Sequence, residues 1–177
     1  MSVIKRFFFH AVSLVSLGMF AGGVGTILRL IIDLVVNSAT TQIGRQSFSA
    51  QSFSLGLALT IIGGALWFFF WRYVQKNVKG KAEETGSAIR AWYLNLVLLI
   101  SLSTAITATT ELISWLVRGA HLVDFSAQML ANILVAGAVW CYHHRIRESE
   151  GQPSPVSKTL RRWYVYIFST WGLVFLA

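Results

Sequence analysis

The sequence predicts an all-α fold: a polytopic transmembrane helical bundle of about five spans, built from repeated helical hairpins, with its N-terminus in the cytoplasm. Three features predict this fold: an apolar composition, five long apolar blocks, and basic residues gathered in alternate linkers. Of the 177 residues, 55% are hydrophobic and only 12% are charged, against roughly 25% charged in a soluble domain. So little charge cannot cover a globule of this length in water, and lipid is therefore the better solvent for the chain.

The five apolar blocks have the length of membrane spans, since a helix needs about 20 apolar residues to cross the hydrocarbon. The blocks cover residues 7–36, 53–73, 91–117, 125–142 and 163–177. We expect a first transmembrane hairpin over residues 1–80, a second over 81–152, and the start of a third over 153–177. The last block is short for a full crossing, so we expect the natural chain to continue into a sixth span.

The basic residues predict the orientation. Twelve of the fifteen Lys and Arg residues precede the first block or follow the second and fourth blocks, and three lie on the other side, Arg29, Arg45 and Arg118. Short loops rich in Lys and Arg remain in the cytoplasm. The N-terminus is therefore expected in the cytoplasm.

Two short patterns recur and indicate duplicated hairpins. The first opens the odd-numbered blocks with a basic residue, any residue and two aromatic residues: Lys5-Arg6-Phe7-Phe8, Arg90-Ala91-Trp92-Tyr93 and Arg161-Arg162-Trp163-Tyr164. The second closes the even-numbered blocks with Gly-Ala-x-Trp and a later arginine: Gly64 to Trp67 with Arg72, and Gly137 to Trp140 with Arg145. Any membrane helix has basic and aromatic flanks, but the matched registers favour duplication of a two-helix unit.

The residues of these patterns suit the membrane surface. Aromatic rings are most stable at the headgroup level, and basic side chains fix the cytoplasmic ends of spans. We therefore predict a set of cytoplasmic interface anchors: Trp67, Arg72, Trp92, Tyr93, Trp140, Arg145, Trp163 and Tyr164.

The repeated basic-aromatic start and the Trp-x4-Arg end resemble an uncharacterised bacterial membrane domain family, a domain of unknown function numbered 5671. The resemblance covers most of the chain. The fourth block departs from the pattern, since it has His143-His144 where the second block has Phe70-Trp71. The resemblance implies a multi-span protein of a bacterial plasma (inner) membrane, built from tandem copies. Members of the family are frequent in green filamentous phototrophic bacteria. The family has no assigned activity.

Small residues at helical spacing in the first two blocks, and the Gly-Ala pair of the fourth, predict helix-packing faces: Gly18, Gly22, Gly25, Gly56, Gly64 and Gly137. Small side chains let neighbouring membrane helices approach closely. Such a flat face can also accept a lipid tail, a quinone or a carotenoid. Apart from such contacts, the sequence predicts no cofactor.

Three ionisable residues form a possible intramembrane polar site, since charged groups near lipid are costly and often functional. Arg29 and Asp33 lie four residues apart and can share one helix face. Glu111 follows a Ser/Thr-rich stretch that could line an ion path. The alternative interpretation is that all three lie at the outer membrane interface and that the hydroxyl groups bond to their own helix.

The sequence also excludes several classes of function. With a single cysteine, Cys141, no intrachain disulfide forms, and no zinc, P-loop or hydrolase motif is present. The net charge of +8 is spread over short loops, so we predict no nucleic-acid partner. We expect no enzyme, no soluble substrate, no catalytic residue and no metal site. Haem ligation by His10, His143 or His144 is an alternative that we disfavour, because two of them are adjacent.

We therefore expect a non-catalytic accessory subunit of a multi-subunit bacterial membrane complex, whose partners are other integral membrane subunits and lipid. An electron-transfer or photosynthetic complex, such as a quinol-oxidising one, is the host that the resemblance suggests. A small transporter or channel with a polar third span and a membrane sensor or regulatory module are the alternatives.

The predicted orientation can be tested at two linkers. In a Cys141→Ser background, single Lys79→Cys and Arg147→Cys variants should both react with a membrane-impermeant thiol reagent only after the membrane is opened. Both positions lie in basic linkers on the same predicted side. Labelling of one from outside and of the other from inside would contradict the hairpin layout.

Overall fold

A computed structural model describes residues 3–39, 49–78 and 87–149, together with separate residues between 159 and 172. These residues form the helices α1 (Val3–Ala39), α2 (Ala50–Val78), α4 (Ala88–Val117) and α5 (Ala127–Ser149), and a short 3₁₀ helix, η1 (Leu122–Asp124). The described part contains no strand. The predicted all-α class is therefore confirmed.

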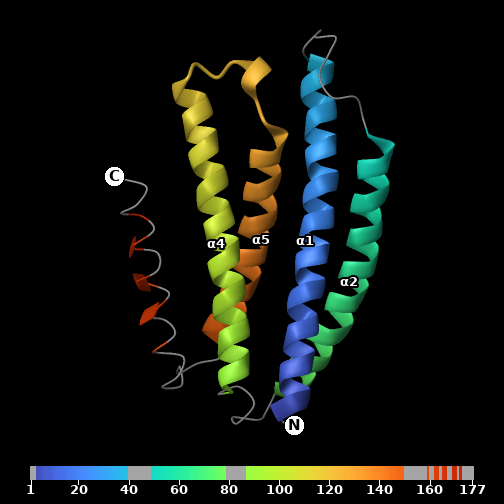
Figure 1. Cartoon of the computed structure of the whole chain (residues 1–177), viewed down its shortest axis with the longest axis vertical. Helices are drawn as coiled ribbons and strands as arrows, with labels where there is room; N and C mark the ends of the chain where they lie inside the picture. The colour runs from blue at the N-terminus through green and yellow to red at the C-terminus, as the bar shows by residue number, and fades with distance from the viewer. Residues whose placement is uncertain are drawn as a thin grey trace.

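The four long helices run alternately up and down as a bundle (Figure 1). Helix α1 packs along α2, and α4 packs along α5. Helix α1 also contacts α5 and α4, so it lies between α2 and the second helix pair, while α2 lies at the edge of the bundle (Figure 1).

Three of these helices, α1, α2 and α4, are long and apolar enough to cross a membrane. Helix α1 has 37 residues, or about 56 Å at 1.5 Å per residue, and so exceeds the roughly 30 Å of hydrocarbon. Helix α5 falls outside this group, because it carries polar residues such as Gln128, Asn132 and His143 among its apolar ones. Most of the fifth apolar block and most of the third hairpin lie outside the described residues.

The contact between α1 and α2 depends on glycine. A Cβ added to Gly23 would lie 2.6 Å from the backbone nitrogen of Thr60 and 2.7 Å from the carbonyl oxygen of Gly56. A Cβ on Gly63 would lie 2.6 Å from the backbone nitrogen of Phe20. Backbone atoms cannot move away as a flexible side chain can, so only glycine allows this approach.

Helices α1 and α4 share local geometry at matched positions of the predicted repeat. The Oγ of Ser16 and the Oγ of Ser101 each donate to the carbonyl oxygens four and three residues earlier, at 2.7 and 3.2 Å. His10 and Asn95 are both buried, and each donates to the carbonyl oxygen four residues earlier, at 2.8 and 2.7 Å. Both pairs have the spacing that relates the two basic-aromatic starts.

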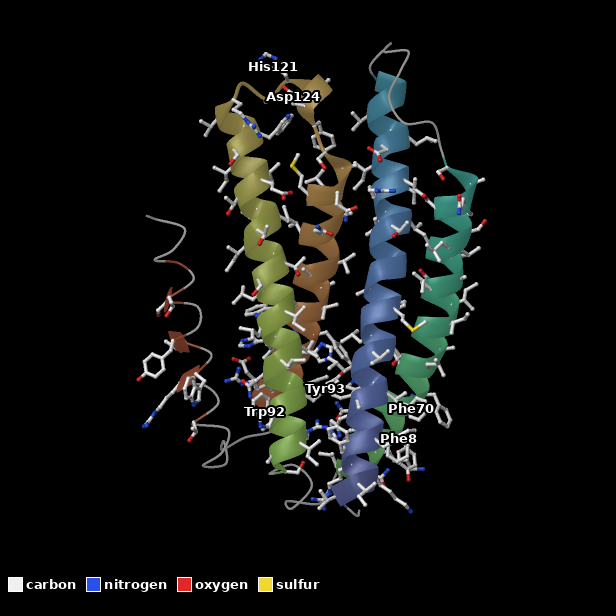
Figure 2. All side chains as sticks on the ribbon, in the orientation of Figure 1. Phe8, Phe70, Trp92, Tyr93, His121 and Asp124 are labelled. Carbon is white, nitrogen blue, oxygen red and sulfur yellow. The ribbon has the colours of Figure 1, made fainter. Side chains whose placement is uncertain are left out.

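The connection from α4 to α5 begins with a tight turn and continues through η1. Gly119 and Ala120 have φ angles of +98° and +53°, in the left-handed region that favours glycine. The indole nitrogen of Trp115 donates to the carbonyl oxygen of His121 at 2.9 Å, which closes the turn. His121 and Asp124 are labelled at this end of the bundle in Figure 2.

The α1–α2 contact predicts a sharp difference between two neighbouring glycines. A Gly23→Ala variant should lose about 1–3 kcal/mol of stability, since its methyl group meets backbone atoms and overpacks the contact. Gly22→Ala is the matched control, because a Cβ there has nothing within 4 Å. Thermal unfolding in mild detergent, followed by circular dichroism, measures both. Equal melting temperatures for the two variants would contradict the contact.

Candidate functional site

Helices α1, α4 and α5 line an open cavity of about 350 Å³, which we call the glycine groove. Helix α1 contributes the largest share of the lining residues, including Gly18, Gly22 and Gly25. A Cβ added to any of these three glycines would meet nothing within 4 Å. The structure therefore places three glycines of the predicted packing face beside open space.

The helix geometry explains why these glycines remain free of the α2 contact. Successive residues are turned by about 100° around a helix. Gly18, Gly22 and Gly25 therefore point away from Gly23, which contacts α2. Helix α1 thus carries two glycine faces on roughly opposite sides: one packs on α2, and the other lines the groove.

The groove is apolar at one end and carries neutral polar groups at the other. Leu14, Val97 and Val139 line the end nearer the N-terminus of the chain. At the other end the side-chain amide of Gln128 donates to the amide oxygen of Asn132 at 2.7 Å. Among the described residues, no Asp, Glu, Lys, Arg or His lines the groove, so it suits an uncharged occupant.

Below the groove, near the N-terminus of the chain, aromatic and polar side chains from all four helices form a buried cluster. Tyr93 and His143 lie at its centre with 4% and 0% of their surface exposed. The rings of Trp71 and Tyr93 stack with centroids 4.9 Å apart. The ring of His10 meets that of Tyr93 edge to face at 5.5 Å. Figure 2 shows Tyr93 pointing into the bundle and Trp92 pointing away from it.

Hydrogen bonds connect this cluster across helices. The Nδ1 of His143 lies 2.9 Å from the carbonyl oxygen of Val139, which can only accept, so Nδ1 carries the proton. Nε2 is then free to accept a long hydrogen bond from the hydroxyl of Tyr93, at 3.4 Å. The indole of Trp71 donates to the hydroxyl of Tyr142 at 2.9 Å. These bonds tie α5 to α4 and α2.

Arg90 is 1% exposed, although its motif predicts a residue at a helix start near the membrane surface. Its Nη2 donates to Oε1 of Gln75 at 3.2 Å, and its guanidinium lies 5.5 Å from the ring centre of Trp71. An aromatic face attracts a cation. The backbone nitrogen of Arg90 donates to the side chain of Ser87, which caps α4.

The predicted interface anchors occupy different environments. Trp92 and Trp163 are 57% and 62% exposed, and Arg72 and Arg145 are also exposed. Trp67 and Trp140 are half-buried; Trp67 stacks on Phe20 and Trp140 stacks on His144. Tyr93 is buried in the cluster, and Tyr164 lies outside the described residues.

Of the other three glycines predicted to pack, two lie in a helix contact and one lies beside open space. Gly56 and Gly64 lie in the α1–α2 contact, where an added Cβ would meet Gly23 or Phe20. Gly137 has nothing within 4 Å of such a Cβ.

The structure does not bring Arg29, Asp33 and Glu111 together. Arg29 and Asp33 are half-buried, and within the described residues no hydrogen bond or ion pair joins their side chains. Glu111 is exposed on α4, as are Thr107, Thr109 and Thr110. These three hydroxyl groups each donate to a carbonyl oxygen one turn earlier.

Sequence reasoning missed the amide pair of the groove and the buried role of His143 in the cluster. Gln128 and Asn132 are uncharged and interrupt an apolar block only briefly, yet their spacing of four already placed them on one face. The buried role of His143 could not be predicted, because its partner Tyr93 lies 50 residues earlier in the sequence, on another helix. Among the described residues, no group of three or more His, Cys, Asp or Glu could hold a metal ion.

Comparison with known proteins identifies one family. The domain of unknown function DUF5671 matches residues 6–129, which is more than two thirds of the chain. No curated protein and no solved structure matches the chain. The matched region contains α2 and α4 entire and all of α1 except its first three residues, and it ends just inside α5.

The buried cluster predicts different effects at two adjacent aromatic residues. Tyr93→Phe should lower stability by about 1 kcal/mol, because it removes the hydroxyl that donates to His143 and leaves a buried ring nitrogen without that partner. Trp92→Phe should change stability little, since Trp92 is 57% exposed. Chemical unfolding in detergent, followed by far-ultraviolet circular dichroism and not by tryptophan fluorescence, compares the two variants. A larger loss of stability for Trp92→Phe than for Tyr93→Phe would contradict this description of the cluster.

Proposed function

We propose that this chain, which belongs to the family of the domain of unknown function DUF5671, is a non-catalytic accessory subunit of a larger bacterial membrane complex. The supporting observation is the apolar surface that the fold leaves uncovered. In the most apolar windows of α1, α2 and α4, only 17%, 11% and 22% of the residues are buried inside the chain. Such a surface needs lipid or other membrane subunits around it.

Helix α2 offers the most continuous of these surfaces. Leu55, Ile62 and Phe69 recur every seven residues and are 59%, 52% and 65% exposed. Leu66 and Tyr73, four residues after two of them, are 41% and 42% exposed. A seven-residue repeat of this kind matches the seam along which two helices pack. Since α2 lies at the edge of the bundle (Figure 1), a transmembrane helix of a partner subunit can lie along this seam.

The topology that goes with this role has five spans and a cytoplasmic N-terminus in the bacterial plasma membrane. The position of the basic residues supports it. Lys5 and Arg6 on α1, Arg72 on α2, Arg90 on α4 and Arg145 on α5 belong to helix ends that lie at the same end of the bundle (Figure 1). Helix α5 pairs with α4 and has 23 residues, or about 35 Å, enough to be the fourth span. We propose that the host is an electron-transfer or photosynthetic complex, such as a quinol-oxidising one. This part of the proposal rests only on the association with the family.

The second candidate, a small transporter or channel, finds less support. Its polar third span would have to line a path, yet Thr107, Thr110 and Glu111 face outward from α4 and not into the bundle. A path along them would need a second copy or another subunit on that face. A sensor or regulatory module, with the basic linkers touching anionic lipid, is a third candidate that no described contact favours.

The accessory role predicts partners at the α2 seam. Affinity purification from native membranes should yield other membrane subunits at equal stoichiometry. A combined Ile62→Ala and Phe69→Ala variant should lose them, because it removes two large side chains from the seam. The matched control is Ile113→Ala with Leu116→Ala, two similarly exposed residues of α4. A chain that purifies without stoichiometric partners would contradict the proposal.

A further inference from the structure

The glycine groove is a slot that runs along the bundle. On α1 its wall extends from Leu14 to Thr26, which is about 18 Å at 1.5 Å per residue. Gly18 and Gly22 on α1 are exposed, and Ile100 on α4 is 55% exposed. The slot therefore opens sideways between α1 and α4, toward the surroundings of the bundle, so an occupant can enter from the bilayer without passing through water.

The size of the slot favours a narrow occupant over a partner helix. A helix is about 10 Å wide with its side chains, so an 18 Å segment would need roughly 1,400 Å³. The groove has about 350 Å³, roughly a quarter of that volume. A single extended hydrocarbon chain is narrow enough to fit, and it would contact Leu14, Leu17 and Val97 along the apolar part.

The polar end of the slot selects one kind of group on that chain. Gln128 is the second residue of α5 and Asn132 lies one turn deeper, so the amide pair is near one end of the expected span. One amide donates to the other, and the –NH2 of Asn132 remains to donate to an acceptor in the groove. Because none of the lining residues that the structure describes is ionisable, an uncharged oxygen such as a carbonyl fits as the acceptor.

We propose that the glycine groove binds one acyl chain of a membrane glycerolipid, with the ester carbonyl of that chain beside Gln128 and Asn132. A glycerolipid has its ester carbonyls just inside the headgroups, which is where the amide pair lies along α5. Its hydrocarbon then runs toward the middle of the bundle over the bare backbone at Gly22 and Gly18. This site needs only the membrane setting, and it is independent of the accessory role proposed above.

The test counts the lipid that the purified chain retains. Native mass spectrometry of the wild-type chain in mild detergent should show one glycerolipid held through delipidation. Gly22→Leu should abolish its retention, because the new side chain enters the slot where nothing lies within 4 Å of the added Cβ. Gly137→Leu is the matched control: its position is equally open but does not line the groove, and this variant should retain the lipid.

Two results would overturn the proposal. One is unchanged lipid retention in Gly22→Leu. The other is a retained molecule without an ester-linked acyl chain, such as an isoprenoid or a carotenoid, identified by mass spectrometry of the extract.

A second measurement uses the unmodified chain and does not depend on the folding of a variant. The chain is reconstituted into vesicles of phosphatidylglycerol in which a small fraction carries a diazirine on one acyl chain. After illumination, crosslinks should concentrate on peptides that contain Ile100 and Val135, which face the groove. Crosslinks spread evenly over these peptides and the exposed face of α2 would contradict a defined site.

Discussion

The contact between α1 and α2 at Gly23 is the constraint on which the rest of the arrangement depends. It brings backbone atoms of the two helices together and leaves no room for a Cβ at Gly23 or Gly63. Because it uses one face of α1, the opposite face with Gly18, Gly22 and Gly25 turns toward α4 and α5. No large side chain of α1 fills the space there, and the glycine groove results.

The two ends of the bundle are consequently held together in different ways. At the end with the chain's N-terminus, Trp71, Tyr93 and His143 bring α2, α4 and α5 into one buried cluster. Beyond this cluster the glycine groove lies between α1, α4 and α5.

The exposed surface bears on function as much as the buried one. In the hydrocarbon of a membrane, burying an apolar side chain between helices gains no hydrophobic free energy. Helix packing must therefore come from close backbone contact and hydrogen bonds. The structure follows that rule: glycine contacts join α1 to α2, and serine, asparagine and histidine bond back to their own helices. The seven-residue seam of α2 is exposed, and the proposed accessory role rests on this exposure.

The sequence by itself determined the helical class, the membrane-like helices and the family, because these depend on composition, on block length and on short local motifs. It also placed matched residues, such as Ser16 and Ser101, in one register of the repeat. Only the tertiary structure decided that Gly23 packs while its neighbour Gly22 lines a groove, and that Tyr93 is buried while Trp92 is exposed. Adjacent residues point about 100° apart on a helix, and which direction faces a neighbour depends on where the other helices lie, which no local pattern records.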